Sequence, residues 1–259
     1  MPQYNGYGLA FFHCIPFFFR EPADLGALSQ KNMPLGCAKA CPHTGFIAPL
    51  LPNPPRALEG VVDGPTAPLL AGEVEPGFTL LCDGKTFDGW KPAEVNKETW
   101  KIEEGAFVTR GKTCHLFYVG DEKPFKNFDL KVDVKTGHNS NGGIYFHTKY
   151  QAEGWPKGGF ECQVNNSHTD WIRTGSLYGL VNIAASPAQD DVWYTQEIIV
   201  QGNSVTVLID GLKVLQYNEP PGAQAGDFER KLSQGTFALQ AHDPGSVIQY
   251  KNIRVKRLD

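Results

Sequence analysis

The chain has 259 residues, a formal net charge of −4 and an isoelectric point near 6.0. Its lysines and arginines are scattered, so no basic patch supports binding to nucleic acid or to an anionic membrane surface. Small ligands of low charge fit this composition better. The 28 glycines, the 19 prolines and the 12% of aromatic residues are typical of strands joined by turns. No long stretch has helical periodicity, and we therefore predict an all-β fold.

The segment 1–75 differs from the rest of the chain, because its prolines are dense and strand alternation is absent. Such a segment cannot form an extended helix. The apolar run 9–19 has no Lys or Arg before it, contains Pro16, and is followed by Arg20 without a small-residue cleavage site. It is also too short to span a membrane. We interpret 1–75 as an irregular or disordered segment, either a degenerate leader or a stretch that includes a start upstream of the true one at Met33.

Six cysteines are divided equally between this segment and the later part of the chain. A chain of this size does not need disulfides for stability, and we expect most of these cysteines to be free thiols. The spacing of Cys37, Cys41 and His43 has some likeness to a metal site, but no second ligand pair of suitable spacing follows. The cysteines are Cys14, Cys37, Cys41, Cys82, Cys114 and Cys162.

From residue 76 onward, strand and turn signals follow one another. In 128–135, the residues Leu130, Val132 and Val134 alternate with charged residues, so we expect the apolar set in a core and the charged set in water. The runs 196–200 and 204–209 are rich in β-branched residues.

The dipeptide Asp210-Gly211 predicts a tight hairpin leading into a strand over 212–217. A last strand is expected within 247–258, where Ile253 and Val255 alternate with basic residues. Together these elements predict that 76–259 is one domain, a two-sheet antiparallel sandwich of the jelly-roll type.

Two strand patterns concentrate polar groups that can do chemistry. In 159–166, Glu161 and Gln163 alternate with apolar residues, and in 236–242 Gln240 and His242 do the same. Because successive strand residues point to opposite faces, each pair lies on one face of its strand. If the two strands are close in the sheet, these groups build a polar site of the size of a sugar.

Seven short motifs follow one another in this region: FTLLCDGKTFDGW (78–90), WKIEEGAF (100–107), NGGIYF (141–146), GFECQ (159–163), TGSLYG (174–179), LQAH (239–242) and KNI (251–253). In this order they resemble the motifs of the 3-keto-disaccharide hydrolase family. The resemblance covers roughly 76–259 and implies a concanavalin A-like jelly roll that acts on glycosides already oxidised at C3. It also implies a periplasmic or extracellular protein.

The chain departs from the family pattern at a few positions. His147 stands where an arginine is usual, and Asn165 and Asn166 stand where many relatives carry an aspartate. The candidate groups Glu161 and His242 are retained.

The implied chemistry begins at C2 of the sugar, whose hydrogen is acidified by the C3 ketone. A base removes this proton, the C1 aglycone is eliminated, and water adds to the enone. We predict His242 as the base, since histidine titrates near neutral pH, and Glu161 as the group that orients it, protonates the leaving oxygen or binds hydroxyls. The predicted substrate-binding residues are Asn139, Tyr145, His147, Trp155, Gln163, Trp171, Tyr178 and Gln240.

Alternatives remain open at this stage. No cofactor is certain, but a divalent cation held by Glu161, His147 and His242 could act as a Lewis acid on the ketone. Classical hydrolysis by two carboxylates needs a paired acid that the pattern does not provide. A non-catalytic carbohydrate-binding module would instead use Trp155 and Trp171 as stacking platforms. All these hypotheses share a carbohydrate partner.

Overall fold

The computed structural model describes residues 74–259, which form thirteen strands and two short 3₁₀ helices, η1 (Lys97–Thr99) and η2 (Asp227–Glu229). The predicted irregular segment 1–75 lies almost wholly outside the described residues. No helix formed by 74–259 is long and apolar enough to cross a membrane. The three cysteines of this range, Cys82, Cys114 and Cys162, are buried free thiols, as expected.

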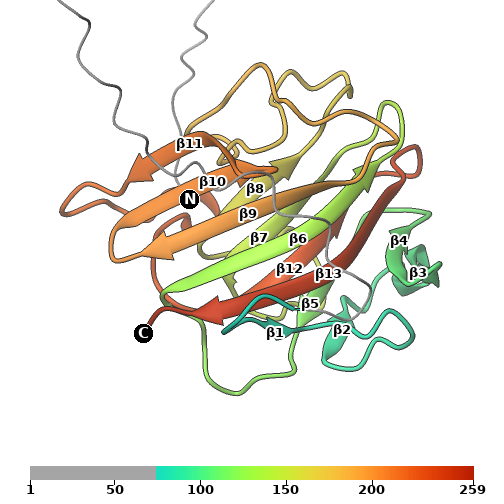
Figure 1. Cartoon of the computed structure of the whole chain (residues 1–259), viewed down its shortest axis with the longest axis horizontal. Helices are drawn as coiled ribbons and strands as arrows, with labels where there is room; N and C mark the ends of the chain where they lie inside the picture. The colour runs from blue at the N-terminus through green and yellow to red at the C-terminus, as the bar shows by residue number, and fades with distance from the viewer. Residues whose placement is uncertain (1–73) are drawn as a thin grey trace, which may run out of the picture. The chain divides into compact units, whose positions relative to one another are not determined.

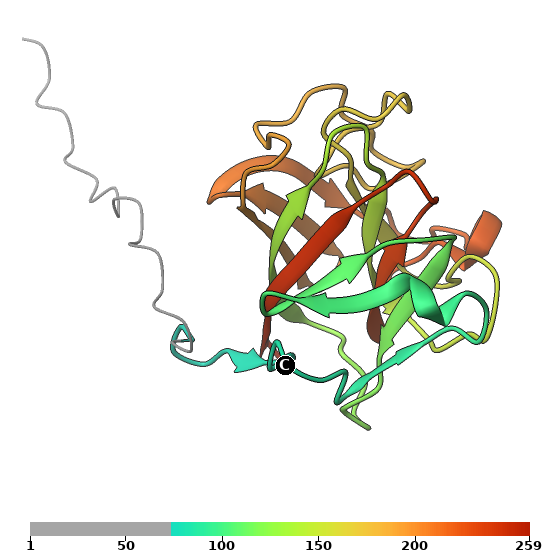
Figure 2. The same ribbon diagram turned by 90° about the vertical axis from the view of Figure 1, so that its right-hand side faces the viewer.

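The strands form two antiparallel sheets, which appear as two layers in Figures 1 and 2. The predicted all-β sandwich is therefore confirmed. The larger sheet has the order β11 (Leu212–Asn218), β10 (Ser204–Ile209), β9 (Tyr194–Gln201), β6 (Phe128–Thr136), β13 (Ile248–Arg257), β4 (Ala106–Thr109) and β3 (Trp100–Glu103), and β1 (Thr79–Leu80) also pairs with β13. The smaller sheet has the order β2 (Trp90–Pro92), β5 (Cys114–Tyr118), β12 (Thr236–Ala241), β7 (Gly142–Thr148) and β8 (Phe160–Val164).

Aromatic rings hold the two layers together. Phe128 of β6 lies with its ring centroid 5.8 Å from that of Phe146 in β7 and 5.0 Å from that of Phe237 in β12. Both contacts have edge-to-face geometry, which favours aromatic pairs beyond the area that they bury. This packing identifies the inner face of each sheet, so the alternate residues of β7, β8 and β12 must point away from the core.

The predicted hairpin is present between β10 and β11. Asp210 and Gly211 have φ values of 49° and 78°, as a two-residue turn with both central residues in the left-handed region requires. The alternation predicted for β6 is also present, because every second residue from Phe128 to Thr136 is buried.

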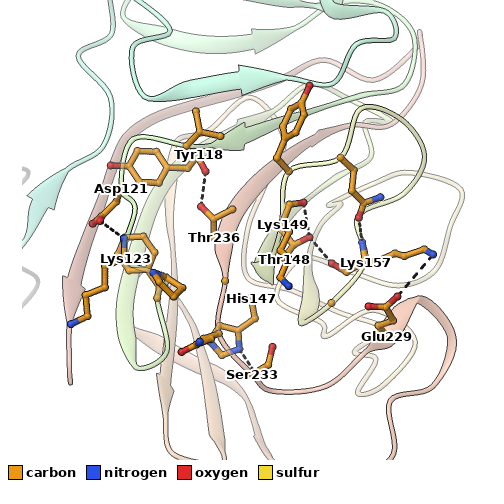
Figure 3. Close-up of a pocket in the computed structure, with 18 of the residues that line it drawn as sticks. Tyr118, Asp121, Lys123, His147, Thr148, Lys149, Lys157, Glu229, Ser233 and Thr236 are labelled. Carbon is orange, nitrogen blue, oxygen red and sulfur yellow. Dashed lines mark hydrogen bonds and ion pairs between the residues drawn. The ribbon is translucent and has the colours of Figure 1, made fainter.

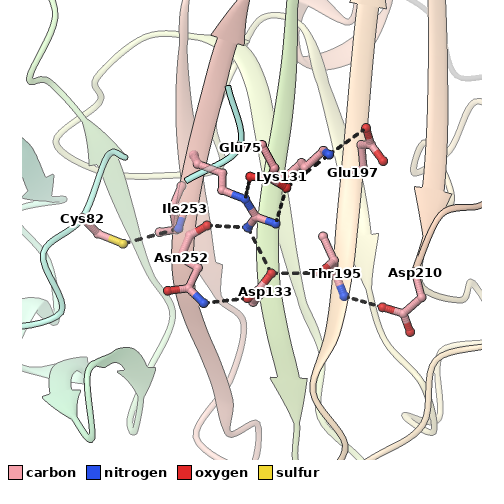
Figure 4. Close-up of polar contacts among 10 residues, drawn as sticks. Glu75, Cys82, Lys131, Asp133, Thr195, Glu197, Asp210, Asn252 and Ile253 are labelled. Atoms are coloured by element: carbon pink, nitrogen blue, oxygen red, sulfur yellow. Dashed lines mark hydrogen bonds and ion pairs between the residues drawn. The ribbon is translucent and has the colours of Figure 1, made fainter. Parts of the chain in front are cut away.

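The charged face of β6 is less exposed than the alternation predicts. Arg254 of β13 is only 6% exposed and donates hydrogen bonds to Glu75 and to Asp133 (Figure 4). Burial acts to raise the pKa of Glu75, but the hydrogen bond from Arg254 lowers this pKa to about 2. Asn252, with φ of 46°, interrupts the pairing of β13 with β6, and this bulge places Arg254 over the sheet. Lys131 and Asp133 of β6 are therefore in ion pairs on the sheet instead of lying free in water.

Replacing Arg254 with methionine keeps the aliphatic stem but leaves Glu75 and Asp133 without their shared cation. Because breaking a largely buried ion pair leaves an uncompensated charge, we expect Arg254→Met to lower the unfolding free energy by about 2 kcal/mol or more. Arg110→Met is the control, since the Arg110 pair with Glu103 is exposed and such pairs contribute less than about 1 kcal/mol. Urea titration of both variants measures the difference, and equal losses would contradict the assignment.

Candidate active site

A cavity of about 650 Å³ lies on the outer face of the smaller sheet. Seven of the residues predicted from the sequence line it: Tyr145, Trp155, Glu161, Gln163, Tyr178, Gln240 and His242. The strands β8 and β12, which carry Glu161 and Gln240, are not neighbours, because β7 lies between them. The predicted proximity is therefore achieved across one intervening strand.

A hydrogen-bonded network bridges the three strands. Tyr145 Oη donates to Glu161 Oε2 at 2.7 Å, and Gln240 Nε2 lies 2.8 Å from Tyr145 Oη and 3.0 Å from Glu161 Oε1. Tyr145 is directly opposite Glu161 in the ladder. All three side chains are buried, so the network holds the carboxyl group at the floor of the cavity.

Gly143 makes room for this carboxyl group. A Cβ atom at position 143 would lie 2.6 Å from Glu161 Oε1 and 2.9 Å from its Cγ. The side chain of Glu161 therefore lies across β7 at Gly143, where the strand has no side chain in its way, and this path lets it reach Gln240.

Burial dominates the electrostatics of Glu161. Desolvation raises the pKa of the carboxyl group, and the hydrogen bond from Tyr145, the charge of Arg230 and the hydrogen bond from Gln240 oppose this effect. The nearest charged nitrogen, Arg230 Nη2, is 3.7 Å from Oε2. A carboxyl group with a raised pKa can serve as a proton donor near neutral pH.

His242 is held by its neighbour in the sequence. Its Nδ1 lies 2.9 Å from Asp243 Oδ2, and Asp243 also accepts hydrogen bonds from the Ser246 hydroxyl and from the Gly245 N–H. Burial acts to raise the pKa of Asp243, but the hydrogen bonds from Ser246 and His242 lower it. An ionised Asp243 fixes the proton of His242 on Nδ1, which leaves Nε2 as the acceptor of the ring.

Two loops complete the walls. Trp155, between β7 and β8, lies with its ring 5.6 Å from His242, and Arg230, between β11 and β12, lies over the ring of Tyr145 at 5.5 Å. The sequence reasoning missed Arg230, as it missed Asn141, Asp170 and Phe228, which also line the cavity. Phe228 lies in the one-turn helix η2 and Arg230 directly follows it, where no periodicity indicates a direction, so only the folded chain could place them.

A second histidine is buried beside the cavity. His115 of β5 lies with its ring 5.5 Å from that of Tyr145 and 5.4 Å from that of Trp155, and its Nε2 has no hydrogen-bond partner among the described residues. Burial, helped by the charge of His242, lowers the pKa of His115 to about 3. His115 is therefore neutral at physiological pH.

Three of the predicted substrate-binding residues do not line this cavity. Asn139 and Trp171 are exposed and lie outside its lining, and the side chain of Trp171 is 57% exposed. The third, His147, lines a separate cavity of about 1190 Å³ (Figure 3).

A β-bulge explains the position of His147. Thr236 of β12 pairs with Thr148 and the next residue, Phe237, pairs with Phe146, so that His147, with φ of 59°, is the extra residue. Its ring packs near Phe146 instead of on the outer face with Tyr145.

Both ring nitrogens of His147 have backbone partners. Nε2 lies 2.9 Å from the Lys126 carbonyl oxygen, and Nδ1 accepts from the Ser233 N–H at 3.2 Å. Burial lowers the pKa of His147 to about 4. The structure thus does not bring His147 together with Glu161 and His242, and residues 74–259 contain no group of three His, Cys, Asp or Glu side chains placed to hold a metal ion.

Comparison with known proteins identifies the family. Residues 77–256 match the profile of the 3-keto-alpha-glucoside-1,2-lyase-like domain. The chain belongs to this family. A 3-keto-disaccharide hydrolase from Bacteroides thetaiotaomicron is 24% identical over 232 residues, which cover 71% of this chain and 79% of that protein. The family predicted from the seven motifs is confirmed, and with it the prediction of a glycoside-cleaving enzyme.

Solved structures of two candidate glycosyl hydrolases from Parabacteroides distasonis have the same fold. They superpose on this member of the 3-keto-alpha-glucoside-1,2-lyase-like family with TM-scores of 0.60 and 0.55, at 24% and 19% identity. The matches cover 71% and 70% of this chain and 94% and 99% of those chains.

The role of Gly143 can be tested by a double-mutant cycle. Gly143→Ala forces the new Cβ against Glu161, and we expect a loss of about 2 kcal/mol in unfolding free energy, as for other overpacked sites. In a Glu161→Ala background the added methyl group has no carboxyl group to meet, so most of this loss should disappear. Gly226→Ala, where a Cβ would meet nothing within 4 Å, is the control. A loss that is the same in both backgrounds would refute the steric explanation.

The buried state of His147 predicts a pH dependence of stability. Its pKa is about 4 in the folded protein against 6.5 ordinarily, so between these values the unfolded chain binds a proton that the folded chain does not. Stability should therefore fall as the pH falls from about 6.5 to about 4, by about 3 kcal/mol for this group.

Urea unfolding at several pH values between 7 and 4.5 measures this effect. His147→Gln should make the dependence less steep, and the slope that remains is expected from His115, whose pKa burial also lowers. His138→Gln, which alters an exposed histidine, should leave it unchanged. If the two variants keep the same slope as the unaltered protein, His147 is not the responsible group.

Proposed function

We propose that the protein cleaves 3-keto-glycosides by elimination of the aglycone followed by hydration. One observation carries the proposal: a single cavity presents the free Nε2 side of His242, fixed by Asp243, together with the buried carboxyl group of Glu161. The name of the Bacteroides thetaiotaomicron relative supports the same substrate class.

Buried acceptors in the cavity favour a sugar as the ligand. Gln163 Oε1 and Gln240 Oε1 are buried and have no hydrogen-bond partner among the described residues, and both side chains line the cavity. Because an unmet buried acceptor is unfavourable, each is suited to accept a hydroxyl hydrogen bond from a ligand. Trp155, which is 39% exposed, offers an aromatic face to the apolar side of a sugar ring.

In the elimination, His242 Nε2 takes the proton from C2. The electron pair of the broken C–H bond forms a C2–C3 double bond, and the C3 carbonyl π pair moves to its oxygen. When this enolate collapses, C1 and C2 become doubly bonded and the bond from C1 to the aglycone oxygen breaks. Glu161 supplies the proton to that oxygen, for which its raised pKa is suited. The products are a 2-hydroxy enone and the free alcohol.

The hydration follows the reverse course with water in place of the alcohol. Glu161, now ionised, removes a proton from water as the water oxygen adds to C1, and the protonated His242 returns a proton to C2. The sum of the two steps consumes one water and gives the 3-keto sugar. Both groups end in their starting protonation states, so the cycle needs no further acid or base.

Turnover of 3-keto-trehalose in D₂O tests the proposal. We expect mass spectrometry to show release of 3-keto-glucose carrying deuterium at C2, with the isolated product incubated alone to correct for exchange. His242→Ala should lower the rate by about 10²-fold or more, as for other general bases, whereas His138→Ala should retain it.

Other outcomes would overturn the mechanism. Cleavage of unoxidised trehalose at an equal rate would indicate hydrolysis by two carboxylates, and glycan binding without turnover would indicate a binding module. Turnover that is lost in EDTA and restored by a divalent cation would add a metal ion to the site.

A further inference from the structure

Arg230 has donor groups that the protein does not use. Its side chain is 19% exposed, yet Nη1 is buried without a hydrogen-bond partner among the described residues. The guanidinium group lines the active-site cavity and lies 5.5 Å from the ring centroid of Tyr145 and 5.7 Å from that of Phe228. The unmet donor of a confined cation indicates a site for an oxygen acceptor of a ligand.

Glu161 does not satisfy this donor. The closest approach between the two groups is 3.7 Å, from Nη2, whereas the oxygens of Glu161 accept hydrogen bonds from Tyr145 and Gln240. Arg230 is thus near enough to Glu161 to be attracted to it, while Nη1 has no partner there.

The chain segment 219–235 holds Arg230 in place. We call this segment the strap. The Gly158 N–H donates to the Phe228 carbonyl oxygen at 2.8 Å, the Leu232 N–H donates to Glu219 Oε2 at 2.8 Å, and the Ser233 N–H donates to His147 Nδ1.

The strap lies between the active-site cavity and the cavity lined by His147. Phe228 and Arg230 line the active-site cavity, whereas Glu229 and Lys231 line the cavity that contains His147. The strap therefore directs one cation, Arg230, toward the active site.

We propose that Arg230 binds the C3 oxygen of the substrate, selecting the ketone and stabilising the negative charge that develops on it. This inference rests on the proposed function and adds a group that contacts the reacting atoms. In the elimination, the electron pair of the C2–H bond forms the C2–C3 double bond and the carbonyl π pair moves onto the C3 oxygen, where the guanidinium group stabilises it with hydrogen bonds and opposite charge. An unoxidised glycoside has a hydroxyl group there and develops no such charge.

The same oxyanion forms in both half-reactions. Addition of water to C1 of the enone again moves the π electrons onto the C3 oxygen before C2 is protonated. Arg230 therefore serves elimination and hydration alike, whereas a group that only protonates the aglycone serves the first alone. The two half-reactions can be measured separately, with 3-keto-trehalose and with the 2-hydroxy enone.

The test compares Arg230→Ala, Arg230→Lys and Lys231→Ala in the full chain. Loss of one oxyanion donor lowers kcat by about 10²- to 10³-fold, and we expect a loss of this size for Arg230→Ala in both half-reactions, with a smaller change in KM. Arg230→Lys should recover only part of the rate, because lysine has no planar fork of donors. Lys231→Ala removes a charge from the same strap on its other side and should remain within about threefold of the unaltered protein.

Rescue distinguishes direct contact from a structural role. Guanidinium ion at millimolar concentration should raise the rate of Arg230→Ala, and urea or sodium chloride at equal concentration should not. A loss in Arg230→Ala no greater than that in Lys231→Ala, or a loss confined to elimination, would overturn the proposal. The proposal would also be overturned if guanidinium restored no activity to Arg230→Ala although this variant unfolded at the same urea concentration as the unaltered protein.

Binding measurements separate this proposal from the proposed function. Calorimetry with 3-keto-glucose and with glucose should show tighter binding of the ketone by the unaltered protein and loss of that preference in Arg230→Ala. If the unaltered protein turns over no 3-keto-glycoside but keeps this Arg230-dependent preference, the proposed reaction fails and the ketone site stands. Equal binding of the two sugars, or no binding of either, would overturn the ketone site.

Discussion

The contact between Glu161 and the bare backbone of Gly143 is the constraint on which the site depends. A carboxyl group that must be buried needs hydrogen-bond donors, and those donors are Tyr145 on β7 and Gln240 beyond it on β12. A glycine at the crossing point lets the side chain take that path. Burial then raises the pKa of the carboxyl group, so one steric feature decides both its position and its chemistry.

The rest of the cavity is built from groups that complement this acid. His242 directly follows β12, and Asp243 and Ser246 orient its ring from the turn there. Among residues 74–259, Gln163 Oε1, Gln240 Oε1 and Arg230 Nη1 have no hydrogen-bond partner, which leaves two acceptors and one donor for a ligand. These unpaired donors and acceptors are suited to a polar ligand. Because they are buried, leaving them without a hydrogen bond costs free energy until such a ligand is bound.

Two β-bulges change the direction in which a side chain points from the direction that regular strand alternation would give. The bulge at His147 turns its ring away from the active site and makes it a support for the strap through Ser233. The bulge at Asn252 lets Arg254 join β13, β6 and the start of the described chain through Asp133 and Glu75. Each is a change of one residue in pairing, yet each reverses or redirects a side chain, because strand faces alternate with a period of two.

The sequence by itself determined the sheet content, the hairpin at Asp210-Gly211, the inward face of β6 and the family, because these follow from local periodicity, turn chemistry and ordered motifs. It also indicated the polar faces of β8 and β12 that carry Glu161 and Gln240, with His242 directly after β12. Only the tertiary structure decided that β7 lies between those strands and that Arg230 lines the cavity. It also decided that the ring of His147 does not lie on the outer face of the sheet with Tyr145. Strand order, bulges and loop paths depend on contacts between residues far apart in the chain, and a local pattern contains no information about them.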